Sequence, residues 1–407
     1  MQGIIKKYAP FWIFLSLFKF GGGLHFSLLA PLGERLFPVW IVGLLIGATA
    51  LLQLLLDVPA GYALDRFGYR RLLKLTTVAF IGATACLLFG LHVYTYIATL
   101  ILATFGWLFF GPGVNAYVLA TAPRSRTGRF ISARDTFESV GIVLSSACLT
   151  FVLGFPTPLI GAILISLLFI AYLCISYAPK ELARQDNLKR SIGHRLAFHD
   201  LMQNMRKLNP ASTMLVLLGL SASIFYGVIW FTIPIVIAHT QGWSPLGIGL
   251  GVFDFSVVVL GFTIGKLTDT FDRRALVFFG LLLFGLAGSI VGFHLGWFFL
   301  LFGFLATTGE EIAGITLWSW LHALDEDHAR DGSISGVINL FQDLGWAIGP
   351  VIAGFAYYSL GPSLTILLGA IPILVVWVVY HLFIGWHQMT PRAMVLALRP
   401  AMRRHKK

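Results

Sequence analysis

The sequence predicts an all-α membrane protein with twelve transmembrane helices in two pseudo-symmetric six-helix bundles. The 407 residues are 57% hydrophobic and only 12% charged, and the mean hydropathy is +0.83. A soluble core cannot hide that much apolar surface in a chain of this length, so the solvent must be lipid. Apolar runs of about 20 residues recur along the chain, and each can cross roughly 30 Å of hydrocarbon.

These runs define the predicted spans in order, and no separate soluble domain fits in what remains. Six runs come before residue 178 and six come after residue 211. The spans are 10–31, 39–63, 72–92, 96–120, 131–154, 157–177, 212–238, 245–267, 274–294, 297–321, 334–358 and 364–386.

A constant offset of 204 residues relates the two halves of the chain. The segment from Gly61 to Arg70 reappears, in degenerate form, from Gly265 to Arg274. One offset over so much sequence indicates a duplicated unit in the same orientation, as in membrane proteins built from two parallel repeats. The other matched pairs are Gly23 and Gly227, Gly43 and Gly247, Gly47 and Gly251, Phe137 and Phe341, and Gly141 and Gly345.

The repeat divides the chain into four predicted regions. An N-terminal bundle covers 1–177 and a C-terminal bundle covers 212–390, with a basic cytoplasmic tail at 391–407. Residues 178–211 form a cytoplasmic linker, in which apolar residues spaced three to five apart among basic ones predict an amphipathic helix on the membrane surface. We interpret the linker as a tether, with binding of a partner as the alternative.

The net charge of +11 reflects membrane topology rather than nucleic-acid binding. With both termini in the cytoplasm, 26 of the 29 Lys and Arg residues fall in cytoplasmic segments. This bias fixes the orientation and predicts contact with the anionic inner leaflet.

Ionisable residues inside the spans are the main indication of function, because each is costly in lipid and should face a cavity or a partner. At about 1.5 Å per residue, most lie roughly 10 to 17 Å from the nearer helix end. Acids outnumber bases seven to two. The residues are Lys19, Asp57, Arg134, Asp135, Glu138, Asp254, Glu310, Glu311 and Asp343.

The surplus of acids favours binding of protons or cations. Burial raises the pKa of a carboxyl group and a nearby base lowers it, so a carboxyl whose surroundings alternate can carry a proton. Glu310 and Asp343 are the first candidates, followed by Asp57 and Glu138. Asp254 is a candidate proton site or cation partner. For each residue alone, a structural ion pair is the alternative.

Span five begins with Arg134, Asp135 and Glu138. One interpretation is a local set of salt bridges around a snorkelling arginine. Polar residues at the matching positions of span eleven, Asn339 and Gln342, favour a role in a cavity or between the halves.

Lys19, aromatic residues and amides complete the predicted cavity. Lys19 either binds an anionic group of a substrate or neutralises Asp57 or another acid. Aromatic walls suit flat, lipophilic or cationic ligands, although each ring could equally pack against helices or lipid. The candidates are Trp107, Phe109, Phe110, Phe225, Tyr226, Trp230, Trp318 and Trp320, with Asn115 and Gln53 as polar contacts.

The loop after the second span reads Gly61-x-x-x-Asp65-Arg66-x-Gly68-x-Arg70-Arg71, and its copy after the eighth span keeps Asp269, Arg273 and Arg274. The two loops resemble the signature loop of the major facilitator superfamily. With the span count and the repeat, the resemblance covers the whole chain. It implies two bundles around a central cavity that work by alternating access.

The charged loop residues predict a cytoplasmic gate, in which contacts of Asp65 and the arginines hold one state closed. A basic turn that only sets topology is the alternative. The second copy has Asp272 in place of Gly68, so its turn should differ.

The sequence departs from drug/proton antiporters of this superfamily in two places. Span five lacks their Gly-Pro pattern, and Gly349-Pro350 lies in span eleven instead. Span four lacks the arginine that those antiporters often carry.

We therefore predict a secondary transporter, not an enzyme, that exports a small amphipathic or cationic compound in exchange for protons. Proton-coupled uptake of an organic anion or metabolite is the alternative, and a non-transporting receptor or scaffold is the alternative of another class. The expected partners are a small-molecule substrate, protons and the lipid bilayer, with no nucleic acid, metal or cofactor. We expect a monomer in a prokaryotic inner membrane.

Overall fold

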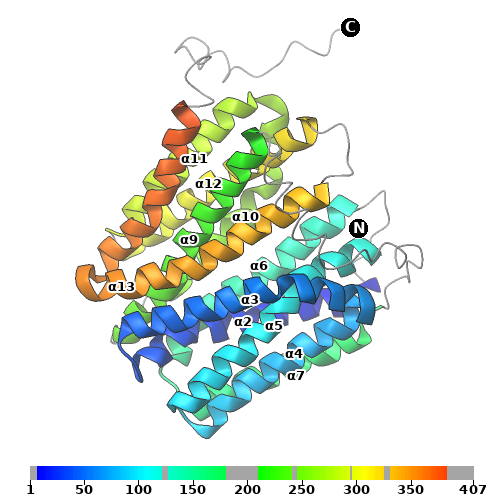
Figure 1. Cartoon of the computed structure of the whole chain (residues 1–407), viewed down its shortest axis with the longest axis vertical. Coiled ribbons are helices and arrows are strands. Elements are labelled where there is room, and N and C mark those ends of the chain that lie inside the picture. Colours follow the sequence, from blue (N-terminus) through cyan, green and yellow to red (C-terminus); the bar gives the residue numbers. More distant parts are fainter. Residues whose placement is uncertain are drawn as a thin grey trace. The chain divides into compact units, whose positions relative to one another are not determined.

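The computed structural model describes residues 7–121, 127–179, 210–240, 245–293, 296–324 and 331–382 (Figure 1). Within these ranges the chain forms eleven α-helices and one short 3-10 helix, and no β-strand. The linker helix predicted within 178–211 and the tail at 391–407 fall almost entirely outside the described residues. The helices belong to two compact units, which are Met1–Ala197 with Ile233–Asp254, and Phe198–Thr232 with Phe255–Lys407.

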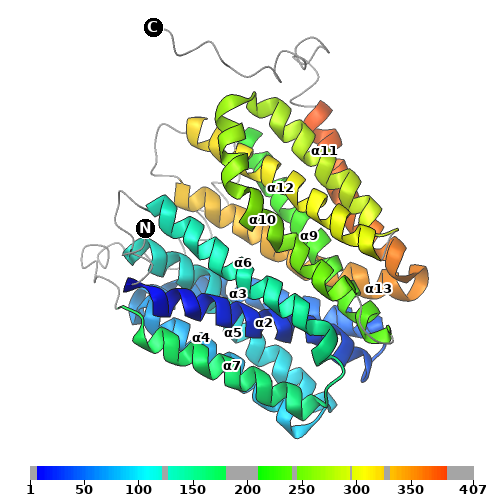
Figure 2. The same ribbon diagram turned by 180° about the vertical axis from the view of Figure 1, so that it is seen from behind.

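The first unit is built around its first helix. Helix α2 packs along both α6 and α7, while α4 packs on α5 and α7 and α3 packs on α5 (Figure 2). The helices are α2 (Ala9–Glu34), α3 (Val39–Phe67), α4 (Tyr69–Ala85), η1 (Cys86–Phe89), α5 (Val93–Thr121), α6 (Thr127–Val152) and α7 (Thr157–Tyr177).

Aromatic side chains form the core between α2, α4 and α5. The ring of Phe18 stacks on that of Phe110, with centroids 4.2 Å apart, and meets Phe80 edge to face at 5.1 Å. Trp107 also meets Phe80 edge to face at 5.2 Å. Interlocked rings of this kind bury large areas and hold one another in fixed orientations.

The second unit takes its helices from the second half of the sequence. Helix α11 packs against both α12 and α13. The second-half helices are α9 (Pro210–His239), α10 (Pro245–Thr270), α11 (Arg273–Val291), α12 (Trp297–Leu324) and α13 (Asp331–Tyr380). The contact-based division places the last part of α9 and the first part of α10 in the first unit.

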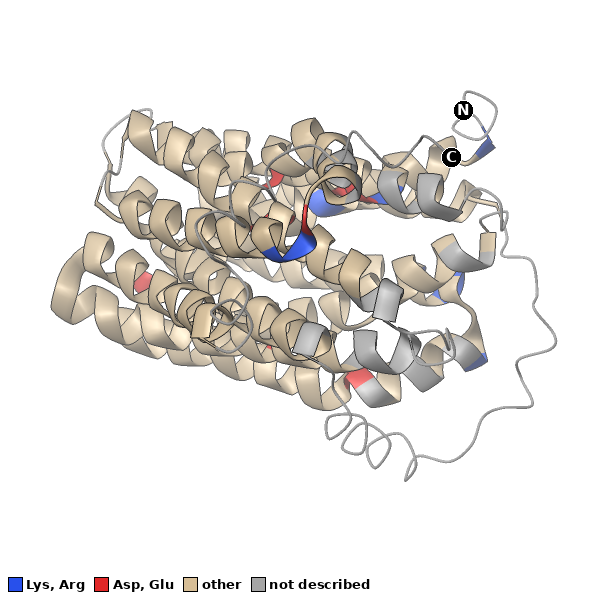
Figure 3. Ribbon diagram, turned by 90° about the horizontal axis from the view of Figure 1, so that it is seen from above, with Lys and Arg blue, Asp and Glu red and all other residues tan. Residues whose placement is uncertain are grey.

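The predicted fold class is confirmed. Ten of the described helices are long and apolar enough to cross a membrane, and Pro245–Leu260 of α10 forms a shorter apolar stretch. One of the ten, α13, turns at Gly361, where φ is 76° and Pro362 follows, so it supplies two legs. These segments are consistent with the twelve predicted spans. Charged residues are correspondingly rare on the described ribbon (Figure 3).

The repeat predicted from the sequence is reproduced at the level of single atoms. A Cβ added to Gly141 would clash with three groups on α2, and a Cβ added to Gly345 would clash with three groups on α9. Each group in the first set lies 204 positions before its counterpart in the second. The groups are Ser16 O, Lys19 Cβ and Phe20 N for Gly141, and Leu220 O, Ser223 Cβ and Ile224 N for Gly345.

The two copies of the loop turn by different chemistry. Gly68 ends α3 with φ of 87°, a conformation that L-residues rarely adopt. At the matching position Asp272 is extended and begins α11 as its N-cap, accepting hydrogen bonds from the backbone N–H groups of Arg274 at 2.7 Å and Ala275 at 3.3 Å. The two turns therefore differ, as predicted. The first is formed by a glycine with positive φ, and the second is formed by an aspartate that caps a helix.

Candidate functional site

The close approach of α6 to α2 at Gly141 places Glu138 beside Lys19. Glu138 lies one helical turn before Gly141, on the same side of α6. The Lys19 Nζ is 3.2 Å from Glu138 Oε2, and the two side chains are 18% and 19% exposed. Lys19 is thus paired with an acid, Glu138, in this conformation. Binding of an anionic substrate group by Lys19 stays a prediction.

Arg134 extends this ion pair along α6 and onto α5. Its guanidinium donates to Asp135 Oδ1, from Nε at 2.9 Å, and also to the side-chain oxygen of Asn115. Its Nε lies 3.7 Å from Glu138 Oε1, so Glu138 stands between two cations. These contacts are the local salt bridges that one interpretation of Arg134 expects, and they extend to Asn115 on α5. A role of Arg134 in a cavity stays a prediction.

Asp254 of α10 is the third acid of the cluster. It belongs to the same compact unit and is half-buried. The charge cluster, defined here as Lys19, Arg134, Asp135, Glu138 and Asp254, thus holds three acids and two bases. With all groups ionised it carries one unbalanced negative charge, which is costly in a low-dielectric interior.

Two aromatic rings border the ammonium of Lys19. The Nζ lies 5.2 Å from the ring centroid of Trp107 and 5.0 Å from that of Phe110. These distances fall in the range of cation–π attraction. Both rings were predicted for the cavity among many aromatics. Their spacing of three residues on α5 puts them on one helix face.

The second unit holds a smaller polar contact. The hydroxyl of Tyr226 on α9 donates a hydrogen bond to Glu310 Oε2 on α12. The Tyr226 ring also packs on Phe284 of α11, with centroids 6.4 Å apart. Two residues predicted separately for the cavity, Tyr226 and Glu310, are therefore neighbours.

The remaining predicted cavity residues lie on different helices. Asp57 is half-buried on α3, and Asp343 is half-buried on α13. Trp230 is 8% exposed on α9. Their roles in transport stay predictions.

Among the predicted gate residues, Arg70 has a structural contact in this conformation. Its guanidinium donates to the carbonyl oxygens of Ile175, at 3.1 Å, and Ser176, at the end of α7. Such contacts satisfy carbonyl groups that a helix end leaves unpaired. In the second copy, the Arg274 guanidinium lies 6.0 Å from the Trp320 ring centroid.

The other gate residues divide into those with described side chains and those without. Arg66 and Arg71 are exposed, and Arg273 is half-buried. The side-chain surroundings of Gly61, Asp65 and Asp269 lie outside the described part of the chain.

A polar contact between the ends of α2 and α9 was not predicted from the sequence. Glu34 Oε2 lies 3.2 Å from His239 Nε2. In the same unit, Gly247 and Gly251 of α10 pack against α6. An added Cβ would lie 2.4 Å from Thr150 Oγ1 at Gly247 and 3.2 Å from Val143 Cα at Gly251. The packing of α10 on α6 was indicated in the sequence by the two repeated glycines, because glycine permits such close helix approach.

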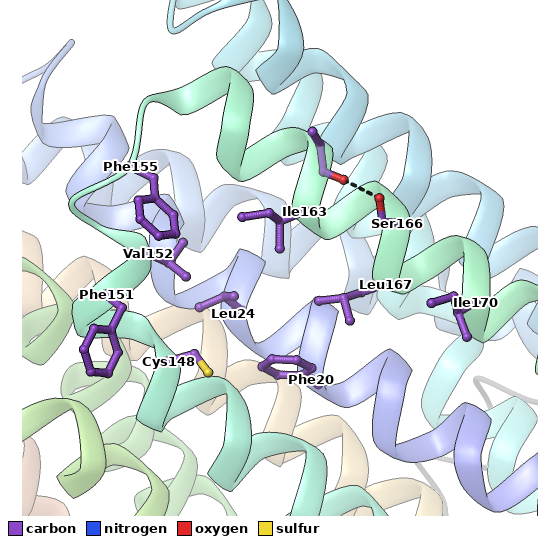
Figure 4. Close-up of a pocket in the computed structure, with 11 residues that line it drawn as sticks. Phe20, Leu24, Cys148, Phe151, Val152, Phe155, Ile163, Ser166, Leu167 and Ile170 are labelled. Atoms are coloured by element: carbon purple, nitrogen blue, oxygen red, sulfur yellow. Dashed lines mark hydrogen bonds between the residues drawn. The ribbon is translucent and has the colours of Figure 1, made fainter.

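An apolar pocket of about 600 Å³ lies between α2, α6 and α7. Figure 4 shows rings and aliphatic chains around it, including Phe20, Phe151 and Leu167. Its hydroxyl, on Ser166, donates to the Ala162 carbonyl of its own helix at 2.9 Å. The lining suits hydrocarbon rather than a charged solute.

A match to a protein-family model identifies the family of this chain. The model of the major facilitator superfamily matches residues 8–209 and 215–395. The chain belongs to the major facilitator superfamily. Membership of this family makes it a multi-pass membrane transporter rather than an enzyme. Members of the family bind small-molecule substrates.

Solved structures share the fold at low sequence identity. The nucleoside transporter NupG aligns with a TM-score of 0.71 and 13% identity, over 91% of this chain and 98% of that chain. The Escherichia coli fucose:proton symporter FucP gives 0.58 and 14%, over 92% and 99%. A D-xylose-proton symporter gives 0.63 and 14%, over 90% and 97%. No curated protein sequence matches the chain.

Proposed function

We propose that this transporter works by alternating access and exports a small amphipathic or cationic compound in exchange for protons. The observation that supports the proposal is the unbalanced acid in the charge cluster of α2, α6 and α10. Either a proton or a cationic ligand neutralises that charge, whereas an anion adds to it. The cluster is therefore suited to cations and protons.

Competition for one charge gives a simple reason for exchange. When a proton neutralises the surplus acid, a cation loses its electrostatic attraction to the site, and a bound cation opposes protonation by the same amount. Proton and cation then occupy the site in turn, which is the requirement for antiport.

The other predicted residues have additional roles in this proposal. Glu310 is the second proton site, because the Tyr226 hydroxyl positions its carboxylate. Asp57 and Asp343 remain further candidates. The loops after α3 and α10 form the gate on the side that we assign to the cytoplasm from the distribution of basic residues.

Proton-coupled uptake is the second candidate function. It is supported by the fold shared with proteins described as fucose:proton and D-xylose-proton symporters. At 14% identity this likeness concerns the fold alone.

The direct test is proton movement in proteoliposomes that contain a pH-sensitive dye and receive pooled organic cations, organic anions or sugars on one side. We expect cations to drive protons in the opposite direction. Protons that move together with an anion or a sugar would favour symport. Compound movement without any proton movement, in every pool, would refute proton coupling.

A further inference from the structure

Two ring faces and one carboxylate surround the ammonium of Lys19 on α2. Trp107 and Phe110 meet edge to face, with centroids 5.7 Å apart and planes at 90°, so they form the corner of a box. Glu138 closes a third side at 3.2 Å. We call Trp107, Phe110 and Glu138 the cation box.

The walls of the cation box are held in place from behind. Phe110 is 2% exposed, and Phe18 stacks on it with planes at 8°. Trp107 is fixed by Phe80, and its six-membered ring lies against Gly22, where an added Cβ would be 3.2 Å from the indole. A rigid pair of rings at right angles beside a carboxylate is the arrangement that recognises alkylammonium groups in proteins.

The occupant of the box is part of the protein itself. An ammonium on a flexible four-carbon stem can leave the box without any backbone movement. Asp254 on α10 is a second acid of the same compact unit, and we take it as the group that receives the ammonium. Lys19 pairs with Glu138 at 3.2 Å in the structure, and Asp254 is not part of the box.

We propose that the cation box is the recognition site for the alkylammonium group of the transported compound, and that Lys19 is a tethered competitor for it. The inference rests on the proposed function, which it deepens by naming the ligand class and its subsite. When Lys19 moves to Asp254, a ligand ammonium takes its place between Trp107, Phe110 and Glu138. A tethered group competes at a high effective concentration, so it lowers the apparent affinity for the ligand.

The test measures binding to the full-length purified transporter in detergent, without any proton gradient. The probes are choline, which carries a trimethylammonium group, and 3,3-dimethyl-1-butanol, its uncharged isostere. We expect Lys19→Met to bind choline about tenfold more tightly than the unaltered chain, because the competitor is gone. The affinity for the uncharged isostere should not change.

Further variants make the result specific. Lys19→Arg keeps a tethered cation and should leave choline affinity low. Adding Trp107→Leu or Glu138→Gln to Lys19→Met should abolish the gain, because each removes one wall of the box. Lys19→Gln replaces Lys19→Met if the methionine variant does not purify as a folded protein.

Two outcomes would overturn the inference. One is an unchanged choline affinity in a folded Lys19 variant, and the other is an equal gain for the uncharged isostere. Because the assay uses no gradient, it separates this inference from the proposed function. Loss of proton coupling with a retained choline gain would refute only the proposed exchange, and proton exchange without a choline gain would refute only the cation box.

Discussion

At Gly141 a single missing side chain determines how closely α6 approaches α2. A Cβ there would lie 2.4 Å from the backbone oxygen of Ser16 and 2.8 Å from Lys19 Cβ. We expect Gly141→Ala to cost about 1–3 kcal/mol of stability, because backbone must move to admit the methyl group. The loss can be measured as a lower midpoint of thermal unfolding in detergent.

Gly111 provides the matched control. An added Cβ at this position meets nothing within 4 Å, although the residue also lies inside a helix. Gly111→Ala should leave the unfolding midpoint unchanged or raise it slightly, since alanine favours helix. Equal losses in the two variants would contradict the close contact assigned to Gly141.

The sequence predicts which ionisable residues belong to the site, but it does not predict which of them pair with one another. Intramembrane charge alone marked Lys19, Glu138 and Asp254, because lipid penalises every such group. Which acid pairs with Lys19 depends on the rotation of α6 and its distance from α2, and neither follows from hydropathy. The repeated glycine at 141 and 345 was the one sequence signal for that contact.

At the scale of elements, the two copies of the signature loop should respond to substitution differently. Gly68→Ala places a side chain at a φ of 87°, which we expect to cost about 1–3 kcal/mol. Asp272→Ala removes an N-cap and should cost about 0.5–2 kcal/mol. Both losses can be measured by thermal unfolding.

Asp272→Asn is the control for the second loop, because asparagine caps helices as well as aspartate does. It should preserve stability. A loss as large as that of Asp272→Ala would mean that the negative charge, and not the cap, matters at this turn.

The elements themselves followed closely from apolar runs. The predicted span 39–63 corresponds to Val39–Phe67, and the predicted span 157–177 corresponds to Thr157–Tyr177. Helix ends beyond the apolar core were missed, as at Phe67, because a helix continues into polar sequence until a group such as Gly68 ends it. Hydropathy identifies the residues that lie in the membrane, but it does not identify the residue that ends a helix.

For the whole molecule, we predict that the Glu34–His239 contact opens during transport, because α2 and α9 belong to different halves of the sequence repeat. In a chain whose three native cysteines are replaced, we would introduce Glu34→Cys and His239→Cys and join them with a short bismaleimide. Crosslinking should reduce transport to background, because the ends of α2 and α9 can no longer separate.

The matched controls are the two single-cysteine chains treated with the same reagent, which should keep their transport. Full transport by the crosslinked protein would show that this contact persists throughout the cycle. In that case the opening that the transport cycle requires would lie elsewhere.

We propose that the charge cluster couples protons to the transported compound, and a comparison of Asp254→Asn with the unaltered protein tests this coupling. Both are reconstituted in proteoliposomes, where dye-reported proton movement and labelled-compound exchange are followed together, with Asp272→Asn as a matched Asp-to-Asn control. We expect Asp254→Asn to lose compound-driven proton movement and Asp272→Asn to retain it. Undiminished proton movement in Asp254→Asn would show that the cluster does not couple protons to the compound.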